Sequence, residues 1–324
     1  MLENMIATLK ADSRTLVFTE GTDPRILEAA SRLKKDGILK PLLLGNPEEV
    51  KAASEKCGWP IDGIQILDPL NFADMEAMVA KLVELRKGKM DEPTCRANLK
   101  KSNYFGTMLV KMGYADGLLG GATYSTADTV RPALQIVKTK PGSKIVSSCF
   151  IMVRKNANGE DEKYVMADCA INIAPNEDEL VEIAVGTART ARVFGIEPKI
   201  AMLSYSTMGS GKGDSVDLMH NAAEKLKAMD LDFAVDGELQ FDAAFAPEVA
   251  KTKAKNSPVA GQANTFVFPD INAGNIGYKI AQRLGGFEAI GPVLQGLNAP
   301  INDLSRGCNA EEVYKMAIIT AALK

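Results

Sequence analysis

Hydroxyl, glycine and basic residues gather in four short segments of the sequence, each at the point where a strand-like run gives way to a helix-like pattern. The last of these, residues 298–309, carries Ser305 and Arg306 on a loop bounded by proline and glycine. A serine hydroxyl is a hydrogen-bond donor, and a guanidinium can form two parallel bonds to a phosphate. This pair could therefore hold one carbonyl group and one phosphate group beside each other.

Residues 120–131, GGATYSTADTVR, form an earlier segment of this kind. Its two glycines allow the backbone to approach a ligand, and Tyr124, Ser125 and Thr126 supply hydroxyls at a helix start, where free N–H groups favour anions. Arg131, about one turn further on, could bind a phosphate. A capped helix whose arginine pairs with a surface carboxylate fits the same pattern, and residue types alone do not separate the two interpretations.

The segment 204–214, SYSTMGSGKGD, looks like a nucleotide-binding loop but matches neither familiar motif. The pattern G-x-x-x-x-G-K would need glycine where Ser206 stands, and G-x-G-x-x-G would need it at Asp214. What remains is a flexible, hydroxyl-rich loop after a strand, with Ser206, Met208 and Gly209 as candidate contacts of a phosphate. A mobile surface loop is the alternative.

The segment 268–279, FPDINAGNIGYK, places two asparagines and two glycines at a helix start. Each glycine there lowers the stability of the helix by up to about 1 kcal/mol relative to alanine. Asn272, Asn275 and Lys279 are therefore candidate ligand contacts. Glycines that admit a closely packed helix are the alternative.

The composition limits the class of protein. The chain has 324 residues, 46% hydrophobic and 24% charged, which suits about two globular domains. A net charge of −3 argues against a nucleic-acid partner. Five scattered cysteines without paired spacing indicate reduced thiols and a cytoplasmic location. Neither a signal-peptide layout nor an apolar run of about 18 residues is present, so no membrane partner is expected.

The sequence lacks the residues that several kinds of catalytic chemistry require. The single histidine, His220, falls in mid-helix, where we expect a solvated side chain and no Ser-His-Asp triad. No His, Cys and carboxylate set has the spacing of a catalytic metal site. Cys149 and Cys169 lie in predicted strands and are expected to be core thiols. We therefore expect no metal and no tightly bound cofactor, and a site that positions an anionic substrate and stabilises its charge.

Strand-like and helix-like patterns alternate along the chain, which predicts an α/β fold of two open, mostly parallel sheets with helices on both faces. Predicted strands cover 15–20, 38–45, 64–69, 116–121, 199–206, 232–240, 264–270 and 287–294, and 144–153 with 163–172 form a predicted hairpin. Predicted helices follow Gly21-Thr22-Asp23-Pro24 and Asn176 and cover 72–86, 93–112, 215–229 and 309–323. Ligands of such sheets bind beyond the carboxyl ends of the strands.

Five blocks in order resemble the phosphate acetyl/butyryltransferase family: GGATYSTADTVRPALQ, LSYSTMGSGKGDSV, VDGELQFDAA, FPDINAGNIGYK and GPVLQGLNAPINDLSRGC. The resemblance implies reversible transfer of an acetyl group between CoA and phosphate, with acetyl-CoA and acetyl phosphate as the other reactants. It also implies an isocitrate/isopropylmalate dehydrogenase-like architecture with an interdomain cleft, a homodimer, and metabolic coupling to acetate kinase. The expected domains are 1–145 with 303–324, and 146–302.

The resemblance also implies roles for individual residues. The family's catalytic Ser-Arg pair falls on Ser305 and Arg306, and its acidic base, seven positions after the serine, falls on Glu312. The CoA-binding arginines fall on Arg131 and Arg86. In the expected reaction the CoA thiolate attacks the carbonyl carbon of acetyl phosphate without an enzyme-bound acyl intermediate.

Three alternatives stay open at this point. A phosphate butyryltransferase would differ in the volume of the acyl pocket. An NAD(P)-dependent decarboxylating dehydrogenase would need a divalent metal held by several aspartates. A non-enzymatic anion-binding module would bind CoA or phosphate without turnover.

Overall fold

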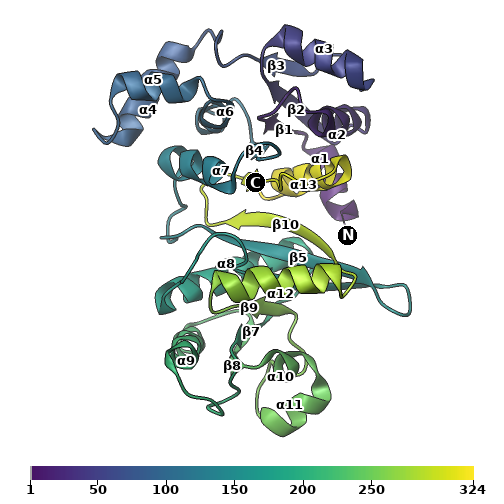
Figure 1. The fold of residues 1–324 in the computed structure, drawn as a ribbon, viewed down its shortest axis with the longest axis vertical. Helices are drawn as coiled ribbons and strands as arrows, with labels where there is room; N and C mark the ends of the chain where they lie inside the picture. The colour runs from purple at the N-terminus through teal and green to yellow at the C-terminus, as the bar shows by residue number, and fades with distance from the viewer. Residues whose placement is uncertain (1) are drawn as a thin grey trace. The chain divides into compact units, whose positions relative to one another are not determined.

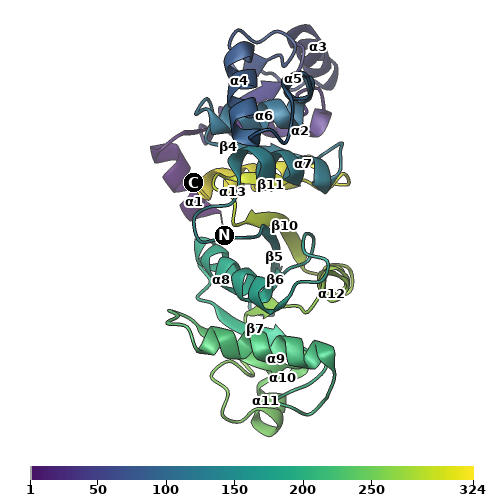
Figure 2. The ribbon, with the colours of Figure 1, turned by 90° about the vertical axis from the view of Figure 1, so that its left-hand side faces the viewer.

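A computed structural model describes residues 2–324, which divide into two units (Figures 1 and 2). The first unit runs to Pro141 and resumes with Leu297–Lys324, and the second is Gly142–Gly296. Each unit is built on one sheet with helices on both faces, so the predicted α/β class is confirmed. The predicted domain bounds, 1–145 with 303–324 and 146–302, stay a prediction.

The sheet of the first unit is parallel throughout, with its strands in the order β11-β4-β1-β2-β3. These strands are β1 (Arg14–Phe18), β2 (Leu39–Leu44), β3 (Gln65–Leu67), β4 (Gly117–Gly120) and β11 (Ile301–Asp303). Leu16, Val17 and Phe18 are all fully buried, as expected for a strand covered on both faces. Strand β11 comes from the far end of the chain and pairs with β4, so late residues join an edge formed by early ones.

Helices cover both faces of this sheet (Figure 1). They are α1 (Glu3–Ala11), α2 (Pro24–Lys35), α3 (Pro47–Cys57), α4 (Met75–Arg86), α5 (Glu92–Leu99), α6 (Ser102–Lys111), α7 (Thr126–Pro132), the π-helical turn η1 (Ala133–Val137) and α13 (Ala310–Ala322). Helices α2 and α13 pack together, whereas α6 packs with α5, α7 and η1. The single helix predicted over 93–112 is wrong, because Lys101 adopts an extended conformation that ends one helix and begins another.

The second unit has a mixed sheet in the order β10-β5-β6-β9-β7-β8. Its strands are β5 (Ser147–Lys155), β6 (Asp161–Ala167), β7 (Lys199–Leu203), β8 (Ala234–Leu239), β9 (Thr265–Val267) and β10 (Glu288–Gln295). The predicted hairpin is confirmed as the antiparallel pair β5 and β6, and β9, β7 and β8 continue in parallel. Strand β10 pairs antiparallel with β5.

The helices of the second unit also lie on both faces of its sheet (Figure 2). They are α8 (Glu177–Val193), α9 (Asp214–Lys227), α10 (Phe241–Phe245), α11 (Pro247–Lys253) and α12 (Ile271–Arg283). Asn176 caps α8 as predicted, since its side chain accepts from the Glu179 amide at 3.0 Å. Phe150 of β5 stacks on Tyr278 of α12 with ring centroids 4.0 Å apart, which fixes that helix on the sheet.

The cysteine side chains of the described chain agree with the sequence-based reasoning. Cys149 and Cys169 are fully buried core thiols, as predicted, and all five cysteines are unpaired. Within residues 2–324, no three His, Cys, Asp or Glu side chains are grouped so that they could hold a metal ion. No helix in the same range is long and apolar enough to cross a membrane.

Candidate active site

Three neighbouring parallel strands, β11, β4 and β1, end at the same edge of the first sheet. The Leu304 amide donates to the Gly120 carbonyl at 2.7 Å, and the Gly121 amide donates to Glu20 Oε1 at 3.1 Å. The two predicted segments 120–131 and 298–309 are therefore brought together, with Glu20 from the end of β1 between them. This edge is where a parallel sheet places its ligands.

Ser305 and Arg306 form an exposed turn at this edge. The turn closes through the Cys308 amide, which donates to the Ser305 carbonyl at 2.9 Å. Ser305 Oγ accepts from the Gly307 amide at 3.2 Å, a contact that leaves the hydroxyl proton free to donate to a ligand. The Arg306 guanidinium forms no ion pair with any described residue, so its charge is available to an anion.

Arg25, which the sequence analysis did not single out, binds the backbone carbonyls of this turn through its side chain. Its Nη1 donates to the carbonyls of Arg306 at 2.9 Å and Cys308 at 3.0 Å, and its Nη2 donates to the Ala122 carbonyl at 2.9 Å. Asp23 fixes the guanidinium in turn, with Oδ2 2.7 Å from Nη2. One side chain thus joins the two predicted loops, and only its place at a capped helix start was visible in the sequence.

Glu312 takes part in the cap of α13. Asn309 Oδ1 accepts from the Glu312 amide at 2.9 Å, and Glu312 Oε2 accepts from the Asn309 amide at 3.1 Å. This capping box satisfies two backbone donors at the helix start. One carboxylate oxygen of Glu312 is therefore bound to backbone, and its role as base stays a prediction.

The predicted ligand hydroxyls after β4 make contacts inside the unit. Tyr124 OH lies 2.8 Å from Thr19 Oγ1, Ser125 Oγ donates to Asp128 Oδ2 at 2.7 Å, and Thr126 Oγ1 donates to Asp303 Oδ2 at 2.6 Å. These bonds arrange the start of α7, and contact with a substrate stays a prediction for all three residues.

Arg131 and Arg86, the two predicted CoA-binding arginines, both affect the pKa of Tyr104. Burial raises the pKa of Tyr104, on α6, and the positive charges of Arg131 and Arg86 partly offset that rise. Arg131 is 60% exposed and lies 3.8 Å from Asp128, a long ion pair that leaves it open to other anions. The Nε atom of Arg86 is buried and has no hydrogen-bond partner in the described structure. Two cations far apart in sequence thus lie near the same ring.

In the second unit, a buried carboxylate organises the predicted loop after β7. Glu238 Oε1 accepts from Ser206 Oγ at 2.8 Å and from the Gly209 amide at 2.6 Å, while Oε2 lies 3.1 Å from His220 Nδ1. Burial would raise the pKa of Glu238, but these hydrogen bonds outweigh it and hold the pKa below its ordinary value. Met208, at the tip, is exposed and has a left-handed backbone with φ of 49°. The loop is therefore held by the protein at its base.

His220 is exposed to solvent on α9, as expected, and it also has a partner that the sequence did not indicate. It is 52% exposed, but it bonds to the fully buried Glu238. The interaction escaped the sequence analysis because strand β8 and helix α9 are brought together only in the folded unit.

Of the predicted ligand contacts at the start of α12, one is bonded within its own unit and two are exposed. Asn275 Nδ2 donates to the Cys169 carbonyl at 3.0 Å, whereas Asn272 and Lys279 are exposed. A Cβ on Gly274 would lie 2.3 Å from the Asp168 carbonyl oxygen, so this glycine is needed for a close backbone approach. Asn275 and Gly274 thus serve packing here, and ligand binding by these asparagines and Lys279 stays a prediction.

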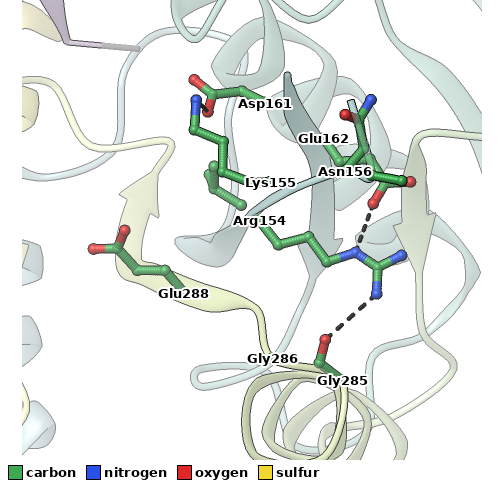
Figure 3. A pocket seen from close by; sticks show the side chains of 10 residues that line it. Arg154, Lys155, Asn156, Asp161, Glu162, Gly285, Gly286 and Glu288 are labelled. Atoms are coloured by element: carbon green, nitrogen blue, oxygen red, sulfur yellow. Dashed lines mark hydrogen bonds and ion pairs between the residues drawn. The ribbon is translucent and has the colours of Figure 1, made fainter. Parts of the chain in front are cut away.

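A cavity of about 800 Å³ lies at the end of the β5–β6 hairpin, away from all these residues in the sequence (Figure 3). Arg154 pairs with Glu162 at 2.6 Å, and Lys155 pairs with Asp161 at 2.6 Å. Its cations are already neutralised, and none of the predicted site residues lines it. The cavity is therefore a poor candidate for binding the phosphate groups of a substrate.

An exposed hydroxyl and a free guanidinium at the carboxyl ends of parallel strands are typical of an enzyme that acts on a phosphate-bearing substrate. The chain belongs to the phosphate acetyl/butaryl transferase family, whose model matches residues 1–321. It is 56% identical over 307 residues to the phosphate acetyltransferase of Bacillus subtilis (strain 168), covering 95% of this chain and 94% of that protein.

Solved structures agree with this relationship. A phosphotransacetylase from Streptococcus pyogenes superimposes with a TM-score of 0.95 at 56% identity, covering 99% of this chain and 96% of that one. A chain from Salmonella typhimurium, assigned to 4-hydroxythreonine-4-phosphate dehydrogenase, shares the fold alone, with a TM-score of 0.54, 15% identity and coverage of 96% of this chain and 100% of that one.

The family and the dehydrogenase-like fold predicted from the five blocks are therefore confirmed. The predicted enzyme class, an acyltransferase with phosphate acetyltransferase activity, is confirmed as well. The butyryltransferase alternative is not favoured at this level of identity, and neither is the decarboxylating dehydrogenase.

Proposed function

We propose that the chain transfers an acetyl group reversibly between CoA and inorganic phosphate in a ternary complex, with CoA and acetyl-CoA as substrates and no tightly bound cofactor. The thiolate sulfur bonds to the carbonyl carbon of acetyl phosphate, the bond from that carbon to the phosphate oxygen breaks, and inorganic phosphate leaves. The observation that carries this proposal is the exposed Ser305–Arg306 turn, which Arg25 holds by its backbone.

Ser305 and Arg306 would act on different parts of acetyl phosphate. The tetrahedral intermediate carries a negative oxygen, and a donor fixed at that oxygen is worth about 3 kcal/mol. The Ser305 hydroxyl, whose oxygen is held by the Gly307 amide, supplies such a donor. The unpaired Arg306 guanidinium would bind the phosphate and neutralise its charge as it leaves.

A base is needed because a free alkyl thiol, with a pKa of about 8.5 by analogy with cysteine, is mostly protonated near neutrality. Glu312 is our proposed base, through the carboxylate oxygen that the capping box does not use. The thiol proton would pass to this oxygen as the sulfur attacks.

The remaining predicted residues would hold the substrates. Arg86 and Arg131 would bind phosphate groups of CoA, for which the buried, unpartnered Nε of Arg86 and the open ion pair of Arg131 are the support. The other proposed contacts are Tyr124, Ser125, Thr126, Ser206, Met208, Gly209, Asn272, Asn275 and Lys279.

Two measurements test direct transfer. Acetyl phosphate and CoA should give thioester absorbance with intersecting double-reciprocal lines, because both substrates must be bound together. Labelled phosphate should not exchange into acetyl phosphate without CoA. Exchange in the absence of CoA, or a labelled acetyl-protein that passes its acetyl group to CoA at the turnover rate, would disprove the ternary mechanism. Binding of CoA without turnover would favour the non-enzymatic module.

We also propose that the chain forms a homodimer through α12. Ile276 and Ile280 are 57% and 53% exposed, and Leu284, at the end of this helix, is 85% exposed. A spacing of four residues puts the three on one face, and such apolar stripes commonly mark an interface. The variant Ile280→Glu should give a monomer mass by light scattering, whereas Leu70→Glu, at an exposed leucine of the first unit, should not.

Two further proposals concern the setting of the enzyme. Five unpaired cysteines support a reducing, cytoplasmic location, which fractionation of cells can test. Acetyl phosphate formed here would be consumed by acetate kinase, within acetate metabolism, and a coupled assay with that kinase should draw the reaction forward. No nucleic-acid or membrane partner is proposed.

A further inference from the structure

The carboxylate of Glu20 binds the backbone of the loop that follows β4. Its Oε1 atom accepts from the amides of Gly121 and Thr123, both at 3.1 Å, and from the Thr123 hydroxyl at 3.3 Å. Backbone N–H groups that converge on one oxygen are the arrangement in which protein loops bind anions. Here a side chain of the protein itself occupies that arrangement.

The second carboxylate oxygen of Glu20 binds a hydroxyl at the same edge of the sheet. Glu20 Oε2 accepts from Thr19 Oγ1 at 2.8 Å. A threonine hydroxyl has one proton, so the Tyr124 hydroxyl, 2.8 Å from Thr19 Oγ1, donates to Thr19. A Cβ on Gly120 would lie 2.2 Å from both hydroxyl oxygens, so only glycine leaves room for the pair. Both oxygens of Glu20 are therefore bound to protein donors.

Arg25 binds the same loop through a backbone group of the opposite kind. Its Nη2 donates to the Ala122 carbonyl at 2.9 Å, between the two amides from which Glu20 accepts. Three successive loop residues thus present an amide, a carbonyl and an amide to two side chains from the junction of β1 and α2. Because Arg25 also binds carbonyls of the Ser305–Arg306 turn, this junction aligns the loop with the turn.

Within residues 2–324, Glu20 forms no ion pair with a cation. Arg25, on the same segment, pairs with Asp23 at 2.7 Å instead. Asp303, another buried carboxyl group at this edge, accepts from hydroxyls of α7 and not from the loop amides. Burial raises the pKa of Glu20, although its hydrogen bonds oppose the rise. The donors of the loop therefore depend on Glu20, and no neighbouring carboxylate serves them.

We propose that Glu20 is a positioning residue, whose carboxylate takes the place of a bound anion on the loop amides and so holds the loop in line with the Ser305–Arg306 turn. The inference rests on the proposed roles of Ser305 and Arg306, and Glu20 is not required to touch the substrate. Since its carboxylate occupies the loop amides, the substrate phosphate is left to the Arg306 guanidinium. Loss of the carboxylate frees the loop, which leads into α7 and Arg131.

Three variants at Glu20 separate the loss of an acceptor from the loss of packing. Glu20→Met keeps a side chain of similar length but cannot accept these bonds, and Glu20→Ala leaves the space open. Because a misplacement of about 1 Å can lower a rate about 100-fold, we expect kcat to be about 10- to 100-fold lower in both. Glu20→Gln keeps an oxygen for the two amides, so its kcat should stay within about fivefold of wild type.

Formate supplies a readout that a packing defect would not give. This one-carbon carboxylate can enter the space left in Glu20→Ala and accept from the freed amides. The kcat of Glu20→Ala, divided by that of wild type at the same formate concentration, should rise about fivefold or more and then saturate. Chloride at equal ionic strength should have no such effect. Glu20→Met should not respond to formate, because methionine fills the space.

Asp116→Ala is the matched control. Asp116 Oδ2 accepts from the Thr15 amide at 2.7 Å, so this carboxylate also joins β4 to β1, at the amino ends of the two strands. Because the ligand-binding edge is at their carboxyl ends, the kcat of Asp116→Ala should stay within about twofold of wild type. Its kcat should not respond to formate.

Hydrogen exchange tests the contact in the wild-type protein itself. Thr123 is an exposed residue, so slow exchange of its amide is expected only if Glu20 holds that amide. Exchange at Thr123 should be about tenfold faster or more in Glu20→Ala. The Leu118 amide, which donates to the Pro300 carbonyl at 3.0 Å, should exchange equally slowly in both proteins.

Three results would overturn the proposal: a kcat of Glu20→Met within about threefold of wild type, a formate response no larger in Glu20→Ala than in Glu20→Met, or rapid exchange of the Thr123 amide in the wild type. The last result decides the matter even where a variant fails to fold. A low kcat in Ser305→Ala alongside any of them would leave the proposed function intact. A wild-type protein that forms no thioester would disprove that function, and hydrogen exchange would still test Glu20.

Discussion

Arg25 Nη1 lies 2.9 Å from the carbonyl oxygen of Arg306, so a side chain at the start of α2 holds the backbone of the proposed catalytic turn. The same guanidinium reaches the loop after β4 through the Ala122 carbonyl. A planar group with five donors can hold several carbonyls at once, which a lysine cannot do in a fixed geometry. The position of the Arg306 side chain thus depends on a residue from another part of the chain.

Replacing Arg25 with lysine should therefore lower activity. Hydrogen bonds from a charged group contribute about 1.5–3 kcal/mol each, so we expect a free energy of unfolding lower by about 1–3 kcal/mol and a kcat lower by at least tenfold. Urea denaturation and steady-state kinetics measure the two effects. Arg32→Lys is the control, since Arg32 lies on the same helix and pairs with Glu311 at 2.7 Å. Normal kcat in Arg25→Lys would show that the turn does not depend on this guanidinium.

Ser305→Ala removes the proposed donor to the oxyanion. Loss of one such donor lowers kcat by about 100- to 1,000-fold, and the KM values should change little because the contact strengthens in the transition state. Stopped-time assays of thioester formation, with circular dichroism to confirm folding, measure this effect. Ser13→Ala, at an exposed loop serine of the same unit, should retain full activity. A kcat for Ser305→Ala within threefold of wild type would assign the oxyanion to another donor.

Arg86 and Arg131 should contribute to CoA binding more than to the chemical step. Each single alanine variant should raise the KM for CoA about tenfold, as expected for the loss of one charge-assisted phosphate contact, with kcat within threefold of wild type. The double variant tests whether they act on one group: a joint effect smaller than the product of the single effects would indicate a shared phosphate. Arg96→Ala, on the surface of α5, is the control. An unchanged KM in both single variants would place CoA elsewhere.

The Glu238 network predicts a pH-dependent stability. The pKa of Glu238 is held below 4.5 in the folded unit, so its charge stabilises the fold at pH values above 4.5 and this contribution is lost as pH falls through the folded pKa. Glu238→Gln should thus lower the free energy of unfolding by about 1.5–3 kcal/mol at pH 7, and by progressively less below pH 4.5. Denaturation at several pH values measures it.

His220 provides an independent check of that network. It is the only histidine in the chain, so its ring proton signals in an NMR spectrum are assigned without further work. They should change in chemical shift in Glu238→Gln, because the ring nitrogen then faces an amide instead of a carboxylate oxygen. Identical chemical shifts in the two proteins would show that the 3.1 Å contact does not persist in solution.

The local patterns of the sequence determine most of the elements and the family. Short apolar runs separated by glycine and hydroxyl residues predicted β1, β2, β3 and β4, and Asn176 before acidic residues predicted a capped helix. Ser305 and Arg306 could be singled out because an exposed, polar turn before a helix is a local feature. The break at Lys101 was missed because both flanking stretches have helix-forming composition and only the backbone conformation separates them.

What the tertiary structure alone decided is which of these turns face each other. Strand β11 lies beside β4, and β4 beside β1, so Asp303 meets Thr129 and Tyr124 meets Thr19, although nothing in the spacing of those residues indicates it. The same holds for Arg25 with Arg306, and for Glu238 with His220. The order of strands in a sheet follows from the burial of whole faces and from how helices pack on them, and neither quantity can be read from one segment at a time.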